Sequence, residues 1–110
     1  MRRGKLTIAI YTGGASPGAA AVIKSRVEEM FGEEYEVYLD FLHEVRRKLR
    51  EKVHQSAQRQ QMMGIVVQWK VLAAIAEGRF GGLPEELFRL LDAGLSPEAL
   101  IRFGERKGLA

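Results

Sequence analysis

The residues best suited to binding a ligand lie in one short turn, residues 12–17, which reads Thr-Gly-Gly-Ala-Ser-Pro. Paired glycines permit the positive φ angles of a tight turn, and a serine followed by a proline is typical of the start of a helix. Free amides and partial positive charge at a helix start favour an anion. From these residues alone, a turn that only starts the helix is the expected interpretation, and an anion-binding turn is the alternative. The candidate anion-binding residues are Thr12, Gly13, Gly14 and Ser16.

A second concentration of charge lies in residues 44–52. Two glutamates in this stretch neutralise part of its positive charge, so a solvated helix face is the expected interpretation. Contact with nucleic acid or with carboxylates is the alternative, although no aromatic residues interleave as stacking platforms. The basic residues are Arg46, Arg47, Lys48, Arg50 and Lys52.

The sequence predicts neither a metal site nor a catalytic residue in this chain. His43 and His54 are eleven positions apart, which is about 16 Å along a helix, so they cannot share a metal ion. The chain has no cysteine, and Glu28 and Glu29 are interpreted as solvated helix-end charges rather than a catalytic pair. The Gly-x-Gly-x-x-Gly spacing of a dinucleotide-binding loop is also absent.

The elements that position these residues follow from periodicity and turn signals. Residues 5–11 are rich in β-branched and aromatic types and predict a strand, whereas the spacing of apolar residues elsewhere predicts helices. The helix over 57–77 is apolar nearly all round and is expected to be the central packing element. Its Met62, Met63 and Trp69 are expected in the core, with the lining of a flat macrocycle pocket as the alternative. The other predicted helices span 17–31, 34–53, 83–91 and 97–107.

The predicted fold class is mainly α with one N-terminal β-strand. We divide the chain into a strand-turn-helix dimerisation segment (1–32), a helical domain (33–80) and a C-terminal helical tail (83–110), with the helical parts forming a bundle. A single strand leaves a row of amides and carbonyls unpaired. We therefore expect it to pair with its copy in a homodimer or with strands on a segment outside this chain.

The stretch from Gly4 to Pro17 resembles the strand and turn that follow the nucleotide-binding domain in siroheme synthases, the precorrin-2 dehydrogenase family. In that family the turn leads into a helix with an Arg-Glu-(Lys/Arg)-(Ile/Leu)-Glu pattern, matched here by Lys-Ser-Arg-Val-Glu-Glu over 24–29. A long basic helix follows, matched over 44–51. The resemblance covers about residues 3–79, and the turn is its most specific part.

This resemblance implies part of an enzyme that oxidises precorrin-2 to sirohydrochlorin with NAD, and it leaves open whether iron insertion follows. The Rossmann domain and the proposed acid-base aspartate of the family would lie before Met1, so no cofactor is expected to bind this chain alone and the chain alone is expected to be inactive. The arginine cluster that opens the third helix in the family is reduced here to Arg59. The implied partners are a second copy, through the N-terminal strand, and a tetrapyrrole, whose binding residues would include Thr12, Gly13, Gly14, Ser16, Lys24 and Arg26.

Composition limits the kind of partner and the location to be expected. A net charge of +3 and a pI near 9.4 suit an acidic partner. We expect a cytoplasmic protein because the sequence has neither a membrane-spanning run nor a secretory signal. A non-enzymatic dimeric interaction module and a small basic nucleic-acid-binding domain using residues 43–54 remain alternatives to the dehydrogenase, although nucleic acid is not the expected partner.

Overall fold

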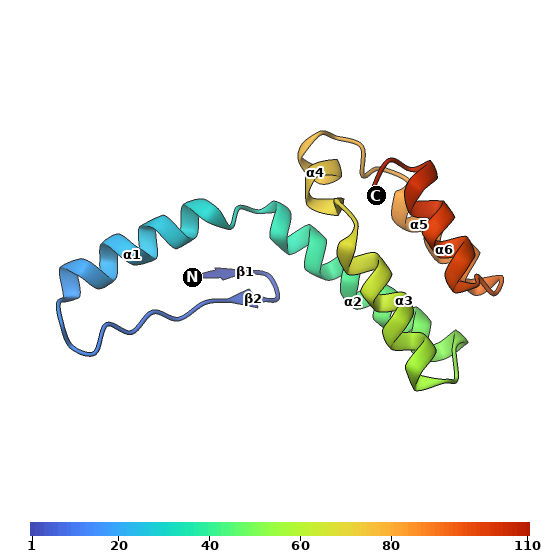
Figure 1. The fold of residues 1–110 in the computed structure, drawn as a ribbon. Helices are drawn as coiled ribbons and strands as arrows, with labels where there is room; N and C mark the ends of the chain where they lie inside the picture. Colours follow the sequence, from blue (N-terminus) through green and yellow to red (C-terminus); the bar gives the residue numbers. More distant parts are fainter.

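The computed structural model describes residues 1–110 and has six helices preceded by a two-stranded antiparallel sheet (Figure 1). The mainly α fold with N-terminal β structure is confirmed. The strands are β1 (Arg2–Arg3) and β2 (Leu6–Thr7), and the helices are α1 (Pro17–Met30), α2 (Glu34–Lys52), α3 (Ser56–Gln68), α4 (Val71–Ala76), α5 (Leu83–Asp92) and α6 (Pro97–Arg106).

The N-terminal strand differs from the prediction. The sequence predicted one strand over 5–11, but β2 ends at Thr7 and pairs within the chain, with Arg2 opposite Thr7 and Arg3 opposite Leu6. Gly4 makes the connection at φ 57°. Residues 5–11 have the composition of a strand, yet a strand extends only as far as a partner supplies hydrogen bonds, and the first residues of the chain provide a short partner.

The hairpin rests on the first turns of α2 and on the end of α1. Lys5 forms an ion pair with Asp40 at 2.7 Å, and Arg3 Nε donates to the carbonyl of Phe31 at 3.1 Å. A Cβ at position 4 would overlap Glu36, so Gly4 also permits this close approach. These contacts place the hairpin beside the α1–α2 junction.

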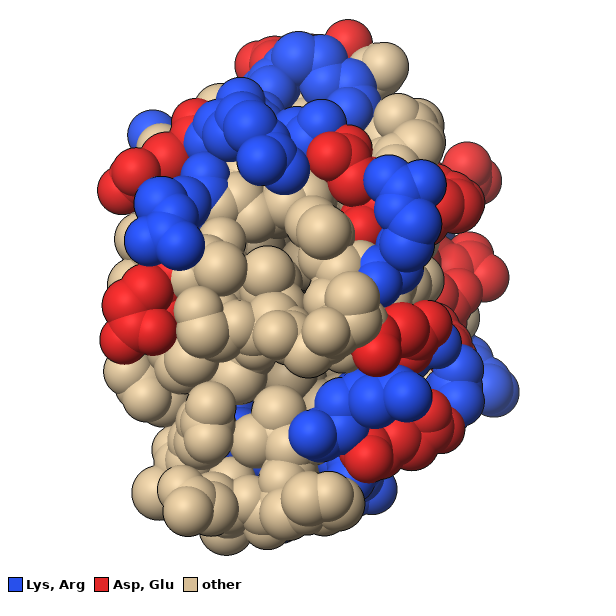
Figure 2. Space-filling model, turned by 90° about the vertical axis from the view of Figure 1, so that its right-hand side faces the viewer, with Lys and Arg blue, Asp and Glu red and all other residues tan.

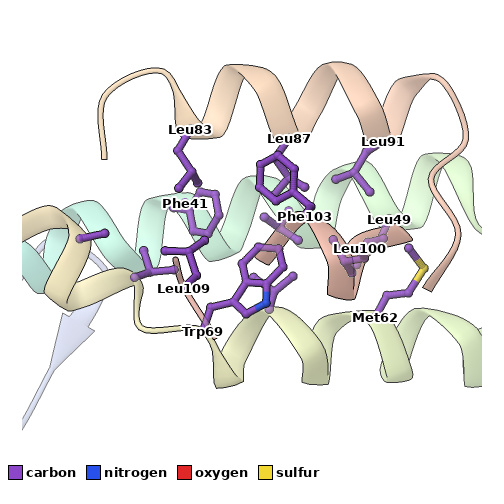
Figure 3. Close-up of a cluster of buried hydrophobic side chains, with 14 residues drawn as sticks. Phe41, Leu49, Met62, Trp69, Leu83, Leu87, Leu91, Leu100, Phe103 and Leu109 are labelled. Carbon is purple, nitrogen blue, oxygen red and sulfur yellow. The ribbon is translucent and has the colours of Figure 1, made fainter. Parts of the chain in front are cut away.

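The hydrophobic core lies entirely in the C-terminal part of the chain, between Phe41 and Leu109. Phe41, Val45 and Leu49 form a buried stripe at i, i+4 spacing on α2, which packs against α3, α4 and α5. Figure 3 shows the leucines of α5 pointing inward from one side while Met62 and Trp69 enter from the other. The centre of packing is therefore α2, and the prediction that the 57–77 helix would be central is wrong.

The predicted helix over 57–77 is in fact two helices, broken between Gln68 and Val71. The amide of Lys70 leaves the helical pattern and donates to the carbonyl of Leu109 at 2.8 Å. Trp69 turns into the core, where its ring lies 5.8 Å from that of Phe103. Tertiary contacts with the C-terminal tail thus replace helical hydrogen bonds at this point.

The tail shares the core with the preceding helices. Leu83, Leu87 and Leu91 repeat on the inner face of α5, and Leu100 and Phe103 do so on α6. Ser96 caps α6 by accepting a hydrogen bond from the Ala99 amide at 3.2 Å, as the Ser-Pro pattern predicts.

The molecule is elongated because its N-terminal part extends away from the core. Its extents are 54 × 31 × 19 Å and its radius of gyration is 17.2 Å, compared with about 13 Å for a compact domain of about 100 residues. No residue of α1 is buried, and Figure 1 shows α1 and the β2–α1 connection reaching away from the helical bundle. We call residues 1–31 the N-terminal arm and residues 41–109 the helical unit.

No helix here is both long enough and apolar enough to cross a bilayer.

We expect Gly104→Ala to lower the free energy of unfolding of the helical unit by about 1–3 kcal/mol, because overpacking a core forces its side chains to shift. A Cβ at position 104 would lie 2.6 Å from Cε2 and 3.0 Å from Cζ2 of Trp69. Urea denaturation, monitored by Trp69 fluorescence, measures this free energy of unfolding. Gly64→Ala in α3 is the matched control, since its Cβ would meet nothing within 4 Å; it should gain up to about 1 kcal/mol from helix propensity. Equal effects of the two substitutions would contradict the packing argument.

The ion pair between Glu86 and Lys107 predicts a loss of stability in acid. The hydrogen bond from Lys107 lowers the pKa of Glu86 below its ordinary 4.5. The stabilisation is therefore complete above the pKa of the unfolded state and is lost as pH falls through the lower pKa of the folded state. Glu86→Gln should be less stable than the wild type at neutral pH, and this difference should vanish in acid. Glu85→Gln, on the exposed side of the same turn, should show no such pH-dependent difference in thermal melts.

Candidate functional site

The candidate anion-binding turn forms a tight corner between the β2–α1 connection and α1. The Ala15 amide donates to the Thr12 carbonyl at 3.1 Å, and Gly13 and Gly14 have φ angles of 65° and 78°. A Cβ at either glycine would meet nothing within 4 Å. Glycine is therefore favoured here by the backbone angles and not by a lack of space.

Ser16 is the N-cap of α1, as the sequence predicts. Its backbone is extended, with φ −172° and ψ 129°, and its Oγ accepts from the Ala19 amide at 3.2 Å. No acidic side chain occupies the first turn of the helix. The hydroxyl is thus already committed to the helix, while the glycines before it are exposed at the surface.

The two predicted cations of this site do not lie beside the turn. Lys24 and Arg26 are about 10 and 14 Å along the helix from Pro17 at 1.5 Å per residue. Two positions on a helix also differ by about 200°, so their side chains leave opposite faces of α1. Lys24 faces the β2–α1 connection, whereas Arg26 does not lie on that side.

Between α1 and the β2–α1 connection runs a shallow groove of about 300 Å³, lined mostly by apolar residues. Ile8, Ala9 and Ile10 form one wall, and Ala20 and Ala21 form the other, with Lys24 at the edge. The turn over 12–17 connects the two walls of the groove, although none of its residues lines the groove. Together they offer an apolar surface, exposed backbone amides and one cation, which suits a ligand with an apolar body and anionic substituents.

This arrangement can bind but carries no group for proton transfer near the turn. Residues 12–18 contain only threonine, glycine, alanine, serine and proline. No group of three or more histidine, cysteine or carboxylate side chains is placed to hold a metal ion. Both histidines are exposed on the helical unit, away from the N-terminal arm.

The other candidate residues divide between the core and the surface. Met62 and Trp69 are buried in the core, while Met63 is half-buried and borders a hollow between α2 and α3. In the basic stretch, Arg47 bonds to Glu44 at 2.9 Å and to Glu51 at 2.8 Å, and its hydrogen bond lowers the pKa of Glu44. Both glutamates of the stretch therefore neutralise Arg47, while Lys48 pairs with Asp92 of α5.

The face that Figure 2 presents has a group of lysine and arginine side chains near its top with carboxylates beside it, and charges of both signs surround a central area of other residues. Binding to nucleic acid needs a continuous basic surface that follows the phosphates. On this face the basic group is confined to one end.

Three arginines lie together at a place that the sequence did not predict. Arg59, on α3, lies across from Arg46 and Arg50 of α2 at the rim of the α2–α3 hollow. A short connection between two helices places the end of the first beside the start of the second. That rule, applied to the predicted helices at 34–53 and 57–77, would have brought the three arginines together.

No protein-family model, curated protein or solved structure matches this chain.

We expect Ser16→Ala to loosen the start of α1 by about 1 kcal/mol, because it removes the side-chain cap. Since α1 buries no residue, the loss should appear as faster hydrogen exchange of the first-turn amides, not as a lower midpoint for the helical unit. Ser16→Asp restores a capping oxygen and should restore protection. Ser25→Ala, on the exposed surface of the same helix, is the matched control. Unchanged exchange in Ser16→Ala would contradict the capping role.

Proposed function

We propose that this chain is the dimerisation and tetrapyrrole-cleft portion of a precorrin-2 dehydrogenase of the siroheme synthase family. In this proposal the parent enzyme oxidises precorrin-2 to sirohydrochlorin with NAD. The nucleotide-binding half, which would carry the catalytic aspartate, is supplied outside these residues. This chain contributes the surface that holds the substrate and joins two subunits.

The observation that carries the proposal is the open N-terminal arm. Its Thr-Gly-Gly-Ala-Ser-Pro corner connects the two walls of an apolar groove bordered by Lys24. A tetrapyrrole with eight carboxylates combines an apolar macrocycle with anionic substituents, so both parts of this surface have a counterpart in the ligand. Thr12 and the exposed amides of Gly13 and Gly14 would meet carboxylates, and the groove wall would meet the macrocycle edge.

A second copy of the chain is the proposed partner of the arm. The segment from Ala9 to Tyr11 makes no backbone hydrogen bond within the chain, and the Tyr11 side chain is 90% exposed. On α1, Val22, Ile23 and Met30 are also exposed. An isologous dimer would bury these side chains and pair the free backbone segments with each other, since a self-complementary surface meets its own copy across a two-fold axis.

The hairpin and the two hydrogen bonds between Met1 and Ile8 already satisfy the backbone up to Ile8, so the proposed dimer contact falls on residues 9–11 and on α1. The proposed contact is therefore shorter than the strand over 5–11 that the sequence predicts. Arg26, which leaves the opposite face of α1 from Lys24, would reach a substrate bound by the partner copy and not one bound in its own groove.

The proposal predicts that the purified chain binds uroporphyrin, a stable macrocycle with eight carboxylates, without oxidising precorrin-2 in the presence of NAD. Removing two charges with Lys24→Gln and Arg26→Gln should weaken this binding by about tenfold, as the loss of charge-assisted contacts implies. The quenching of porphyrin fluorescence measures the affinity.

The matched control is Arg89→Gln with Arg102→Gln, which removes two exposed charges from the tail. It should leave the affinity unchanged. Equal weakening in both double variants would mean that uroporphyrin binding depends only on the net charge of the chain. A failure of the wild type to bind uroporphyrin would support a dimeric interaction module without a tetrapyrrole role.

A further inference from the structure

The hollow between α2 and α3 has a basic rim and an apolar floor. It measures about 400 Å³, within the range of small-ligand pockets, about 300–1,000 Å³. Leu49 and Met63 form its apolar part, and Arg46, Arg50 and Arg59 surround it. No carboxylate lines it.

Two of these arginines have no partner within the chain. Arg46 and Arg50 lie one turn apart on α2, and neither makes a hydrogen bond or ion pair to another side chain or to the backbone. The nearby carboxylates, Glu44 and Glu51, both bind Arg47 instead. The positive charge of the rim is therefore uncompensated.

The third arginine is held in place. Arg59 Nη1 donates to the carbonyl of Val53 at 2.8 Å and to that of His54 at 3.0 Å. These bonds tie the start of α3 to the end of α2 and fix one side of the guanidinium. Its remaining N–H groups are free to donate, and a guanidinium held in one position loses less entropy when it binds an anion.

The start of α3 adds further donors. Gln55, its N-cap, makes no side-chain hydrogen bond to the first turn, so the first amides of this 13-residue helix lack a capping partner. Ser56 begins the helix and lines the hollow. The helix end, with its partial positive charge, faces the same space as the arginines.

We infer that this hollow binds a small anion carrying two or more oxyanion groups, either phosphates or carboxylates. Arg46 and Arg50 hold one group, since residues at i, i+4 have Cβ atoms about 5–6 Å apart. Arg59, Ser56 and the first amides of α3 hold another across the apolar floor. The inference does not depend on the proposed tetrapyrrole function, because the hollow belongs to the helical unit and not to the N-terminal arm.

Calorimetric titration of the full chain with pyrophosphate and with citrate, at constant ionic strength maintained with chloride, tests this inference. Saturable binding of one anion per chain is expected for at least one of the two, and their relative affinities distinguish phosphate from carboxylate chemistry. The double substitution Arg46→Gln with Arg50→Gln should weaken the affinity for the anion about tenfold. Both positions are exposed, so helical circular dichroism should be retained.

Arg89→Gln with Arg102→Gln is again the matched control and should bind as the wild type does. The inference is overturned if neither anion binds above the chloride background, or if both double variants lose affinity equally. A small anion carries no macrocycle, so these outcomes are independent of whether uroporphyrin binds the N-terminal arm.

Discussion

The buried stripe of Phe41, Val45 and Leu49 on α2 is the surface on which the helical unit is assembled. Helices α3, α4 and α5 all pack against α2, and α6 closes the core through its contact with α3. Truncating a leucine at such a site typically costs about 2–5 kcal/mol. The stripe also fixes the antiparallel relation of α2 and α3, and with it the position of the three arginines around the hollow.

The N-terminal arm does not depend on the buried stripe of α2 or on the core assembled around it. It adds no residue to the core. Its contacts with α2 include the exposed ion pair between Lys5 and Asp40, which contributes little, and the edge-on contact of the Phe31 ring with that of Tyr35. A two-stranded hairpin is marginal by itself. The arm therefore has few interactions that hold it in a unique conformation, and its exposed apolar side chains are the reason to expect that another surface completes it.

Local signals in the sequence predicted the helix starts well. The Ser-Pro pairs at 16–17 and 96–97 both open helices in which serine caps the first turn, and the amphipathic spacing of 34–53 matches α2 closely. These features were predictable because the caps and periodicity act within a few residues. The turn over 12–17 was predictable for the same reason.

Features that depend on distant residues were not predicted. The break before Val71 requires the carbonyl of Leu109 and the space left by Gly104, which lie more than 30 positions away in the sequence. The strand was assigned too long because β propensity does not reveal where the partner strand ends. The separation of Lys24 from Arg26 does follow from helix geometry, since positions two apart on the predicted helix over 17–31 leave different faces.

Light scattering of the purified chain over a wide concentration range tests most directly the claim that a second copy completes the arm. We predict a concentration-dependent dimer that Tyr11→Asp weakens at least tenfold by placing a charge in the contact. Val67→Asp, on the exposed surface of α3, should leave the dimer intact. A chain that stays monomeric throughout, or one whose dimer is equally sensitive to both substitutions, would contradict the account.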